Sequence, residues 1–153
     1  MREIIQSRLW IGNAADVRDA RRLNDFGVEA VVDLAYEEPL AQLTRGMLYC
    51  RFPILDGEGN RTSLLSMAVE TTAAFIRHRT ATLVGCGAGM SRSPAVAAVA
   101  LAVVRRVSPE ACLLELTAAH PHDISPQLWN DLRKVYNQVV GDRPAEHPWE
   151  SRS

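Results

Sequence analysis

The chain has 153 residues, of which 47% are hydrophobic and 23% are charged, and its formal net charge at pH 7 is −1. This length suits one domain with a substantial core, and a charge so close to zero excludes a bulk attraction to nucleic acid or to a membrane surface. No apolar run reaches the roughly 18 residues of a transmembrane helix, the start lacks a signal-peptide pattern, and three cysteines argue against a disulfide framework, so we expect a reducing, cytoplasmic compartment.

The first third of the chain predicts one helix and two strands. Residues 16–26 have an amphipathic helical pattern that ends at Gly27, and residues 28–34 follow as an apolar strand. Residues 47–52 are a further strand candidate.

Thr62 or Ser63 is suited to cap a helix that continues to about Arg77. The short apolar run 81–84 predicts a buried strand, and residues 94–104, nearly all alanine and valine, predict a buried helix.

Two later helices have clear start signals. Ser108 precedes Pro109, which places a capping serine before a proline at the first helical position, and Ser125 with Pro126 repeats the pattern. Residues 142–153 are rich in charge and proline, so we expect a flexible tail after a domain that spans residues 1–141. The alternation of strands and helices predicts a single α/β domain with a central, mostly parallel sheet of four to five strands, flanked by helices.

The segment between the strand at 81–84 and the helix at 94–104 carries the chemistry. Cys86 and Arg92 bracket five residues that include two glycines: Gly87, Ala88, Gly89, Met90 and Ser91. Small residues let successive backbone N–H groups point inward as an anion-binding concavity, and the following helix adds the positive end of its dipole. Arg92 supplies a planar fork for two phosphate oxygens, so the loop predicts a phosphate site.

The same field favours an ionised thiol at Cys86, the form that attacks phosphorus. One helix terminus contributes about 0.3–1 kcal/mol, which is too little alone, so the amides and Arg92 must supply most of the stabilisation. The competing interpretation is a small buried residue in a turn. We prefer that interpretation for Cys50 and Cys112, which have no such loop around them.

The run Cys86-Gly87-Ala88-Gly89-Met90-Ser91-Arg92-Ser93-Pro94 resembles the signature loop of the cysteine-dependent protein tyrosine phosphatases, and most closely that of the small, atypical dual-specificity phosphatases. Residues 9–15 and 27–34 are similar to the first strands of that family, residues 52–56 to its acid loop and residues 124–129 to the start of its last helix. The resemblance covers roughly residues 4–140, in matching order. A low-molecular-weight phosphatase would carry its loop near the N-terminus, so the position of Cys86 argues against that branch.

The resemblance implies roles for two further residues. Asp56 matches the family's general acid, which protonates the leaving group and then activates water, although an Asp-Gly pair is also typical of a turn. Glu58 is the alternative acid. Ser93 matches the hydroxyl that hydrogen-bonds the cysteine sulfur, and a helix N-cap is its alternative role.

One residue departs from the family pattern. Gly85 stands where the family has a histidine that holds the loop and stabilises the thiolate. The resemblance therefore implies reduced activity, and a Gly85→His substitution is expected to raise it. A catalytically weak or inactive phosphate-binding pseudophosphatase is the alternative, and a sulfur- or arsenate-handling enzyme is a weaker one.

The expected partners follow from the loop. Its interior has no lysine, whereas family members that act on inositol lipids carry lysines there, so we expect a phosphotyrosine monoester, and also phosphoserine or phosphothreonine, on a protein or peptide. Phosphate, sulfate or vanadate should occupy the same loop. We expect no cofactor, no metal, no nucleic acid and no membrane partner; His120 and His122 flank a proline without a suitably spaced third ligand.

Overall fold

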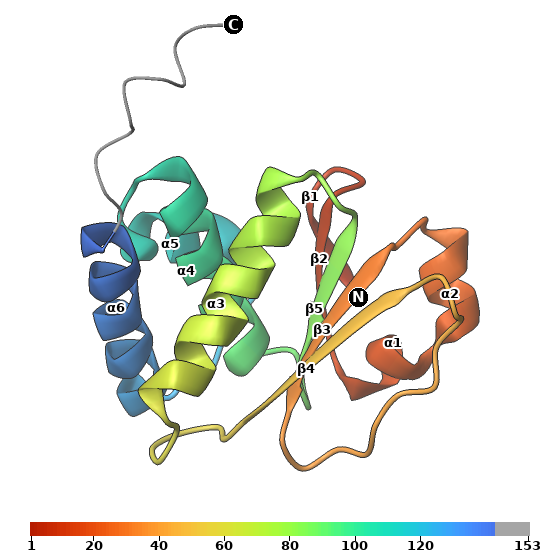
Figure 1. Cartoon of the computed structure of the whole chain (residues 1–153), viewed down its shortest axis with the longest axis horizontal. Helices are drawn as coiled ribbons and strands as arrows, with labels where there is room; N and C mark the ends of the chain where they lie inside the picture. Colours follow the sequence, from red (N-terminus) through yellow and green to blue (C-terminus); the bar gives the residue numbers. More distant parts are fainter. Residues whose placement is uncertain (143–153) are drawn as a thin grey trace, which may run out of the picture.

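A five-stranded sheet separates two layers of helices in the computed structural model, which describes residues 1–142 (Figure 1). The strands are β1 Arg2–Ile5, β2 Leu9–Gly12, β3 Ala30–Ala35, β4 Leu48–Ile54 and β5 Thr82–Gly85. The helices are α1 Ala14–Arg18, α2 Ala20–Asp25, α3 Thr62–Arg77, α4 Arg92–Arg105, α5 Pro109–Thr117 and α6 Pro126–Gly141. Among the described residues, none of the helices is long and apolar enough to span a bilayer.

The strand order is β1-β2-β5-β3-β4. Strand β1 runs antiparallel to β2, and the other three pairings are parallel, with Leu83 of β5 beside Trp10 of β2 and Val31 of β3. The predicted α/β fold with a mostly parallel sheet of four to five strands is therefore confirmed. β5 lies at the centre, so the loop that follows it leaves the middle of the sheet's carboxyl edge.

An apolar cluster lies between each face of the sheet and the helices that pack on that face. Helices α1 and α2 lie on one side and α3 to α6 on the other (Figure 1). Because side chains alternate along a strand, Leu9 and Ile11 join the cluster beneath α3 to α6, while Trp10 joins the smaller cluster on the opposite side.

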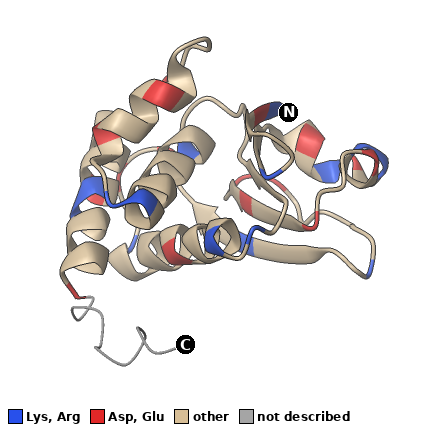
Figure 2. Ribbon diagram, turned by 90° about the horizontal axis from the view of Figure 1, so that it is seen from above, with Lys and Arg blue, Asp and Glu red and all other residues tan. Residues whose placement is uncertain are grey.

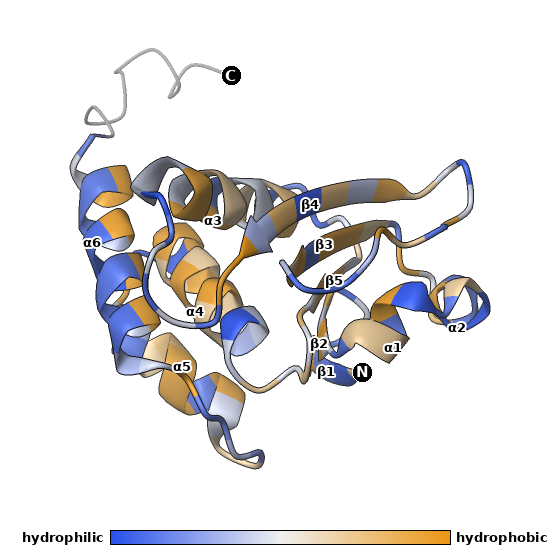
Figure 3. Cartoon of the chain, turned by 90° about the horizontal axis from the view of Figure 1, so that it is seen from below, coloured by the Kyte–Doolittle hydropathy of each residue, from blue (hydrophilic) through white to orange (hydrophobic). Residues whose placement is uncertain are grey.

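Helix α4 is the most enclosed helix of the larger layer. Every residue from 92 to 103 is buried, and the helix contacts α3, α5, α6 and the sheet. Figure 3 shows its hydrophobic colouring between these neighbours. A helix that is apolar all round belongs in a core, and its many alanines let the neighbours approach closely. This burial holds the first turn of α4 in place.

Several predicted boundaries were wrong. The single helix expected over residues 16–26 is two helices, because Asp19 leaves the helical conformation and its side chain accepts a hydrogen bond from the Arg22 N–H, starting α2 anew. Neither Thr62 nor Ser63 caps α3, whose N-cap is Arg61 without a side-chain bond. Strand β1 has no counterpart in the sequence prediction.

The predicted starts of the last two helices are confirmed. Ser108 caps α5 by accepting from the Ala111 N–H at 3.2 Å, and α6 begins at Pro126, although Ser125 makes no side-chain capping bond. Asp142, where the predicted tail starts, is the C-cap of α6. The rest of that tail, residues 143–153, lies outside the described part of the chain.

Candidate active site

The loop from Cys86 to Ser91 connects the end of β5 to the start of α4. Its backbone is tied to the turn between β2 and α1. The Cys86 N–H donates to the Gly12 carbonyl at 3.2 Å, and the Ala14 N–H donates to the Gly87 carbonyl at 3.0 Å. Gly89 has a φ of 73°, and a Cβ there would lie 3.0 Å from the Gly12 carbonyl oxygen. The two chain segments therefore fix the loop's shape together.

Cys86 lies at the base of this loop and is 2% exposed. Its Sγ is 3.1 Å from the Oγ of Ser93, which is fully buried in the first turn of α4. Ser91, not Ser93, is the N-cap of α4, so the alternative role of Ser93 as an N-cap is absent, while its hydroxyl lies within hydrogen-bond distance of the sulfur. Cys50 and Cys112 are also free thiols, and burial raises the pKa of both above the ordinary cysteine value.

Arg92 is 5% exposed, and hydrogen bonds hold the terminal nitrogens of its guanidinium. Its Nη1 and Nη2 donate to the two carboxylate oxygens of Glu37 at 2.6 and 2.5 Å, and Nη1 also donates to the Ile54 carbonyl at 3.0 Å. This pairing raises the pKa of Arg92, and it holds the pKa of Glu37 at about 2. The buried Nε has no hydrogen-bond partner among the described residues. A buried, charged donor without an acceptor is costly, so Nε is a position where a ligand oxygen would be stabilised.

Asp56 follows β4 on an exposed loop and reaches the same site. It accepts a hydrogen bond of 2.5 Å from the Ser91 hydroxyl. Asn60 closes the loop behind it, because its side chain accepts from the Leu55 N–H and donates to the Leu55 carbonyl, at 2.8 and 2.9 Å. Glu58, the alternative acid, is exposed and is not among the residues that line the pocket.

These groups surround one pocket of about 440 Å³. Its lining brings together predicted site residues and three acidic residues that the sequence did not single out. The lining residues are Glu37, Glu38, Asp56, Cys86, Gly87, Ala88, Met90, Ser91, Arg92 and Asp123. Ser93 contacts the pocket's sulfur from behind, and Gly89 faces the β2–α1 turn.

The missed acidic residues come from two loops. Glu37 and Glu38 follow the carboxyl end of β3, which is parallel to β5, and this adjacency is a signal that could have placed them at the same edge. Asp123 comes from the α5–α6 connection, where its N–H donates to the Met90 carbonyl at 2.8 Å. No local sequence pattern marks that contact.

Gly85 is required by its neighbour on α1. A Cβ at this position would lie 2.2 Å from Cγ2 of Val17, closer than any tolerated contact. A histidine at this position would have to displace Val17, so the rise in activity expected for Gly85→His stays a prediction that also requires Val17 to move.

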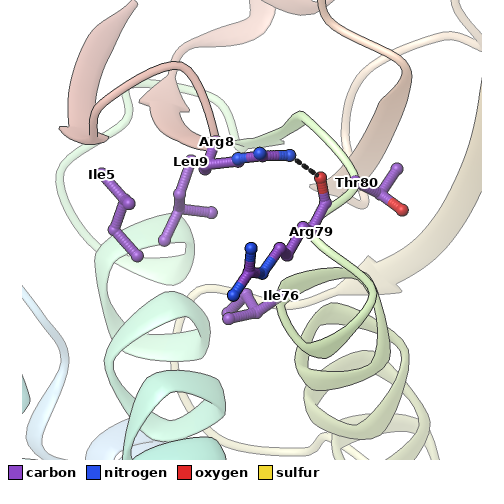
Figure 4. A pocket seen from close by; sticks show the side chains of 6 residues that line it. All are labelled: Ile5, Arg8, Leu9, Ile76, Arg79 and Thr80. Atoms are coloured by element: carbon purple, nitrogen blue, oxygen red, sulfur yellow. Dashed lines mark hydrogen bonds between the residues drawn. The ribbon is translucent and has the colours of Figure 1, made fainter.

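A second pocket of about 220 Å³ lies away from the loop, at the start of β2 and the end of α3 (Figure 4). It is lined by Ile5, Arg8, Leu9, Ile76, Arg79 and Thr80, and the Arg8 side chain donates to the Arg79 carbonyl. This lining has no carboxylate, thiol or imidazole for catalysis. Within residues 1–142, no three His, Cys, Asp or Glu side chains gather as a metal site.

Neither the models of known protein families nor the curated proteins compared with this chain give a match. Comparison with solved structures does give matches. Human DUSP28 superposes with a TM-score of 0.79 at 24% identity, over 94% of this chain and 100% of that chain. The chain has the dual-specificity phosphatase fold.

Two further structures with this fold are informative. A putative dual-specificity phosphatase from mouse, complexed with zinc tungstate, gives a TM-score of 0.77 at 23% identity, over 91% of this chain and 87% of that chain. The human tyrosine phosphatase-like serine/threonine/tyrosine-interacting protein gives a TM-score of 0.76 at 16% identity, over 91% of this chain and 96% of that chain. The resemblance that the loop suggested is thus matched by structural neighbours that include small dual-specificity phosphatases.

Proposed function

We propose that the protein is a cysteine-dependent phosphatase for phosphorylated proteins or peptides. In the first step the Cys86 sulfur forms a bond to phosphorus while the bond to the ester oxygen breaks, and the departing oxygen takes a proton from Asp56. In the second step the Asp56 carboxylate takes a proton from water as that water attacks the phosphocysteine. The Cys86 sulfur leaves with its charge stabilised by the Ser93 hydroxyl, and inorganic phosphate is released.

One observation carries this proposal: the Cys86 sulfur, the Arg92 guanidinium and the Asp56 carboxylate meet at a single pocket. The buried Nε of Arg92, which has no partner within residues 1–142, supports a phosphoryl oxygen as its acceptor. The N–H groups of the loop, from Gly87 to Arg92, and the N-terminus of α4 supply further donors for the charge that develops in the transition state.

The structural neighbours support the same chemistry. Tungstate, present in the mouse protein's complex, is a tetrahedral oxyanion like phosphate. The absence of lysine between Cys86 and Arg92 favours a monoester such as phosphotyrosine, with phosphoserine and phosphothreonine as further substrates. The three free cysteines support a cytoplasmic, reducing setting.

Hydrolysis of an aryl phosphate tests the proposal. We expect turnover that vanadate inhibits and that Cys86→Ser abolishes, while Cys50→Ser, which removes a thiol from β4 outside the pocket, retains it. Activity that survives Cys86→Ser would rule the mechanism out.

A phosphate-binding module is the second candidate, and Gly85 favours it. The histidine that the family pattern has at this position is missing, and Val17 occupies its space. Calorimetric binding of a phosphotyrosine peptide without any turnover would support this alternative. Turnover of the same peptide would dismiss it.

A further inference from the structure

The rim of the pocket carries an excess of negative charge. Four acidic residues line it, Glu37, Glu38, Asp56 and Asp123, and three of them remain as carboxylates when Asp56 carries the proton that it donates in the proposed first step. Among the described residues that line the pocket, Arg92 is the only basic one. Elsewhere among the described residues, acidic and basic residues occur together on the helices of both layers (Figure 2). The imbalance at the pocket is therefore local and does not reflect the net charge of −1.

The charge of Arg92 is already balanced. Glu37 pairs with both terminal nitrogens of the guanidinium at 2.5 and 2.6 Å, so this ion pair has no net charge. Two more arginines are near Glu38: Nη2 of Arg18 is 3.9 Å from its carboxylate, and Nη2 of Arg51 donates to its carbonyl at 2.7 Å. Neither Arg18 nor Arg51 lines the pocket.

Nε of Arg92 is buried and has no hydrogen-bond partner among the described residues, and it is the donor to which the proposed function assigns a phosphoryl oxygen. Because this nitrogen is buried, a phosphoryl oxygen that accepts from it would lie deep in the pocket. The rest of the substrate would then contact the exposed rim. Asp123 and Asp56 are exposed there, and Glu38 is half-buried. A substrate with acidic residues beside the phosphorylated one would place like charges against the carboxylates of Glu38 and Asp123, and a substrate with basic residues there would pair with them.

We propose that this site selects phosphorylated peptide segments that carry arginine or lysine beside the phosphorylated residue. The inference rests on the proposed phosphatase function and adds the class of substrate. Glu38 and Asp123 are the residues that determine this specificity, because both lie at the rim and neither is needed for the phosphoryl chemistry. The same charges disfavour a substrate with several phosphates, such as an inositol polyphosphate.

Matched phosphotyrosine peptides provide the test. Two peptides differ only in having arginine or glutamate at the positions that flank the phosphotyrosine, and kcat/KM is measured for each at low ionic strength. We expect the basic peptide to be preferred about tenfold, and the preference to shrink to about twofold or less near 0.5 M salt, where rim charges are screened.

Two variants locate the effect. Glu38→Gln and Asp123→Asn should each reduce the ratio of kcat/KM between the basic and the acidic peptide, and hydrolysis of a small aryl phosphate by each variant checks that its active site is still assembled. Glu70→Gln, an exposed carboxylate on α3 outside the pocket, is the matched control and should leave the preference as it is.

The outcomes separate this inference from the function it rests on. Equal rates for the two peptides, faster hydrolysis of the acidic peptide, or faster hydrolysis of a soluble phosphoinositide headgroup would overturn the inference while aryl phosphate hydrolysis upholds the function. If no substrate is hydrolysed, the phosphatase proposal fails. Fluorescence anisotropy with the two labelled peptides then still tests the charge preference: tighter binding of the basic peptide supports it, and equal or weaker binding contradicts it.

Discussion

At the scale of single residues, Glu37 is the main finding that the sequence did not suggest. Its carboxylate accepts hydrogen bonds from both terminal nitrogens of Arg92, and the buried Nε is left without a partner among the described residues. A guanidinium held at one end presents its remaining N–H groups in a fixed direction, because its five donors lie in one plane. Glu37 is thus placed as a positioning residue for Arg92.

This ion pair predicts a pH dependence of stability. Arg92 lowers the pKa of Glu37 from 4.5 to about 2, so the ionised carboxylate is favoured in the folded state. The resulting stabilisation is present above pH 4.5 and is lost as the pH falls through 2. The contribution of this ion pair to the free energy of unfolding is modest, because the Glu37 side chain is 50% exposed to water.

Urea unfolding of wild type and Glu37→Gln measures this effect, since glutamine does not titrate. We expect the wild type to be the more stable protein at pH 6, and the difference in the free energy of unfolding between the two proteins to narrow steadily toward pH 2. A gap that stays constant over this range would contradict the assignment.

Gly85 predicts a stability effect through its contact with Val17. In Gly85→Ala the new Cβ would lie 2.2 Å from Cγ2 of Val17, and overpacking of this kind costs about 1–3 kcal/mol. The double variant with Val17→Ala removes Cγ2, so the two changes should be strongly non-additive.

Chemical denaturation of the wild type, the two single variants and the double variant gives the four free energies of unfolding of a double-mutant cycle. The double variant should be more stable than the sum of the single effects implies. Gly46→Ala is the matched control, because a Cβ there meets no atom within 4 Å. Additive effects of the two substitutions at Gly85 and Val17 would contradict the packing argument.

At the scale of elements, the strand, loop and helix around Cys86 could be predicted because their signals are local. A short apolar strand, a glycine-containing loop and an alanine-rich helix follow one another in sequence, and β5, the loop and α4 follow in the same order. The break at Asp19 was missed because an amphipathic pattern continues across it, whereas a single aspartate side chain restarts the helix.

The acidic rim shows what local patterns cannot provide. Glu37 and Asp123 reach the pocket from loops that are brought there by strand order and by the Asp123–Met90 backbone bond. Gly85 departs from the family pattern in sequence, but the contact that requires a glycine comes from Val17, which is far away in sequence and adjacent in space.

The loop that carries Asp56 predicts a change in leaving-group sensitivity. Asn60 ties this loop through both backbone groups of Leu55, and Asn60→Ala would leave these groups to water. If Asp56 is the proton donor, a looser loop should slow the hydrolysis of phosphates with poor leaving groups about tenfold, and affect good leaving groups much less.

A series of aryl phosphates whose phenols differ in acidity checks this effect. We expect a steeper dependence on the leaving group in Asn60→Ala than in wild type, and the steepest in Asp56→Asn. An unchanged dependence in both variants would show that Asp56 does not donate the proton.

At the scale of the whole molecule, two helical layers and one sheet hold the pocket from several directions. The loop emerges from the central strand β5, the β2–α1 turn supports it from one side, and the loop after β3 brings Glu37 from the other. Ligand sites in sheets of this kind lie outside the carboxyl ends of the strands, where such loops converge. The fold therefore explains why residues distant in sequence share one pocket.

The central claim is that the Cys86 sulfur carries the phosphoryl group between the two steps. Rapid acid quenching of wild type mixed with a phosphotyrosine peptide, followed by digestion and mass spectrometry, tests it most directly. We predict one phosphoryl group on the fragment that contains Cys86, none on those with Cys50 or Cys112, and none at all in Cys86→Ser. A phosphoryl group on another residue, or steady hydrolysis with the fragment containing Cys86 never modified, would contradict the account.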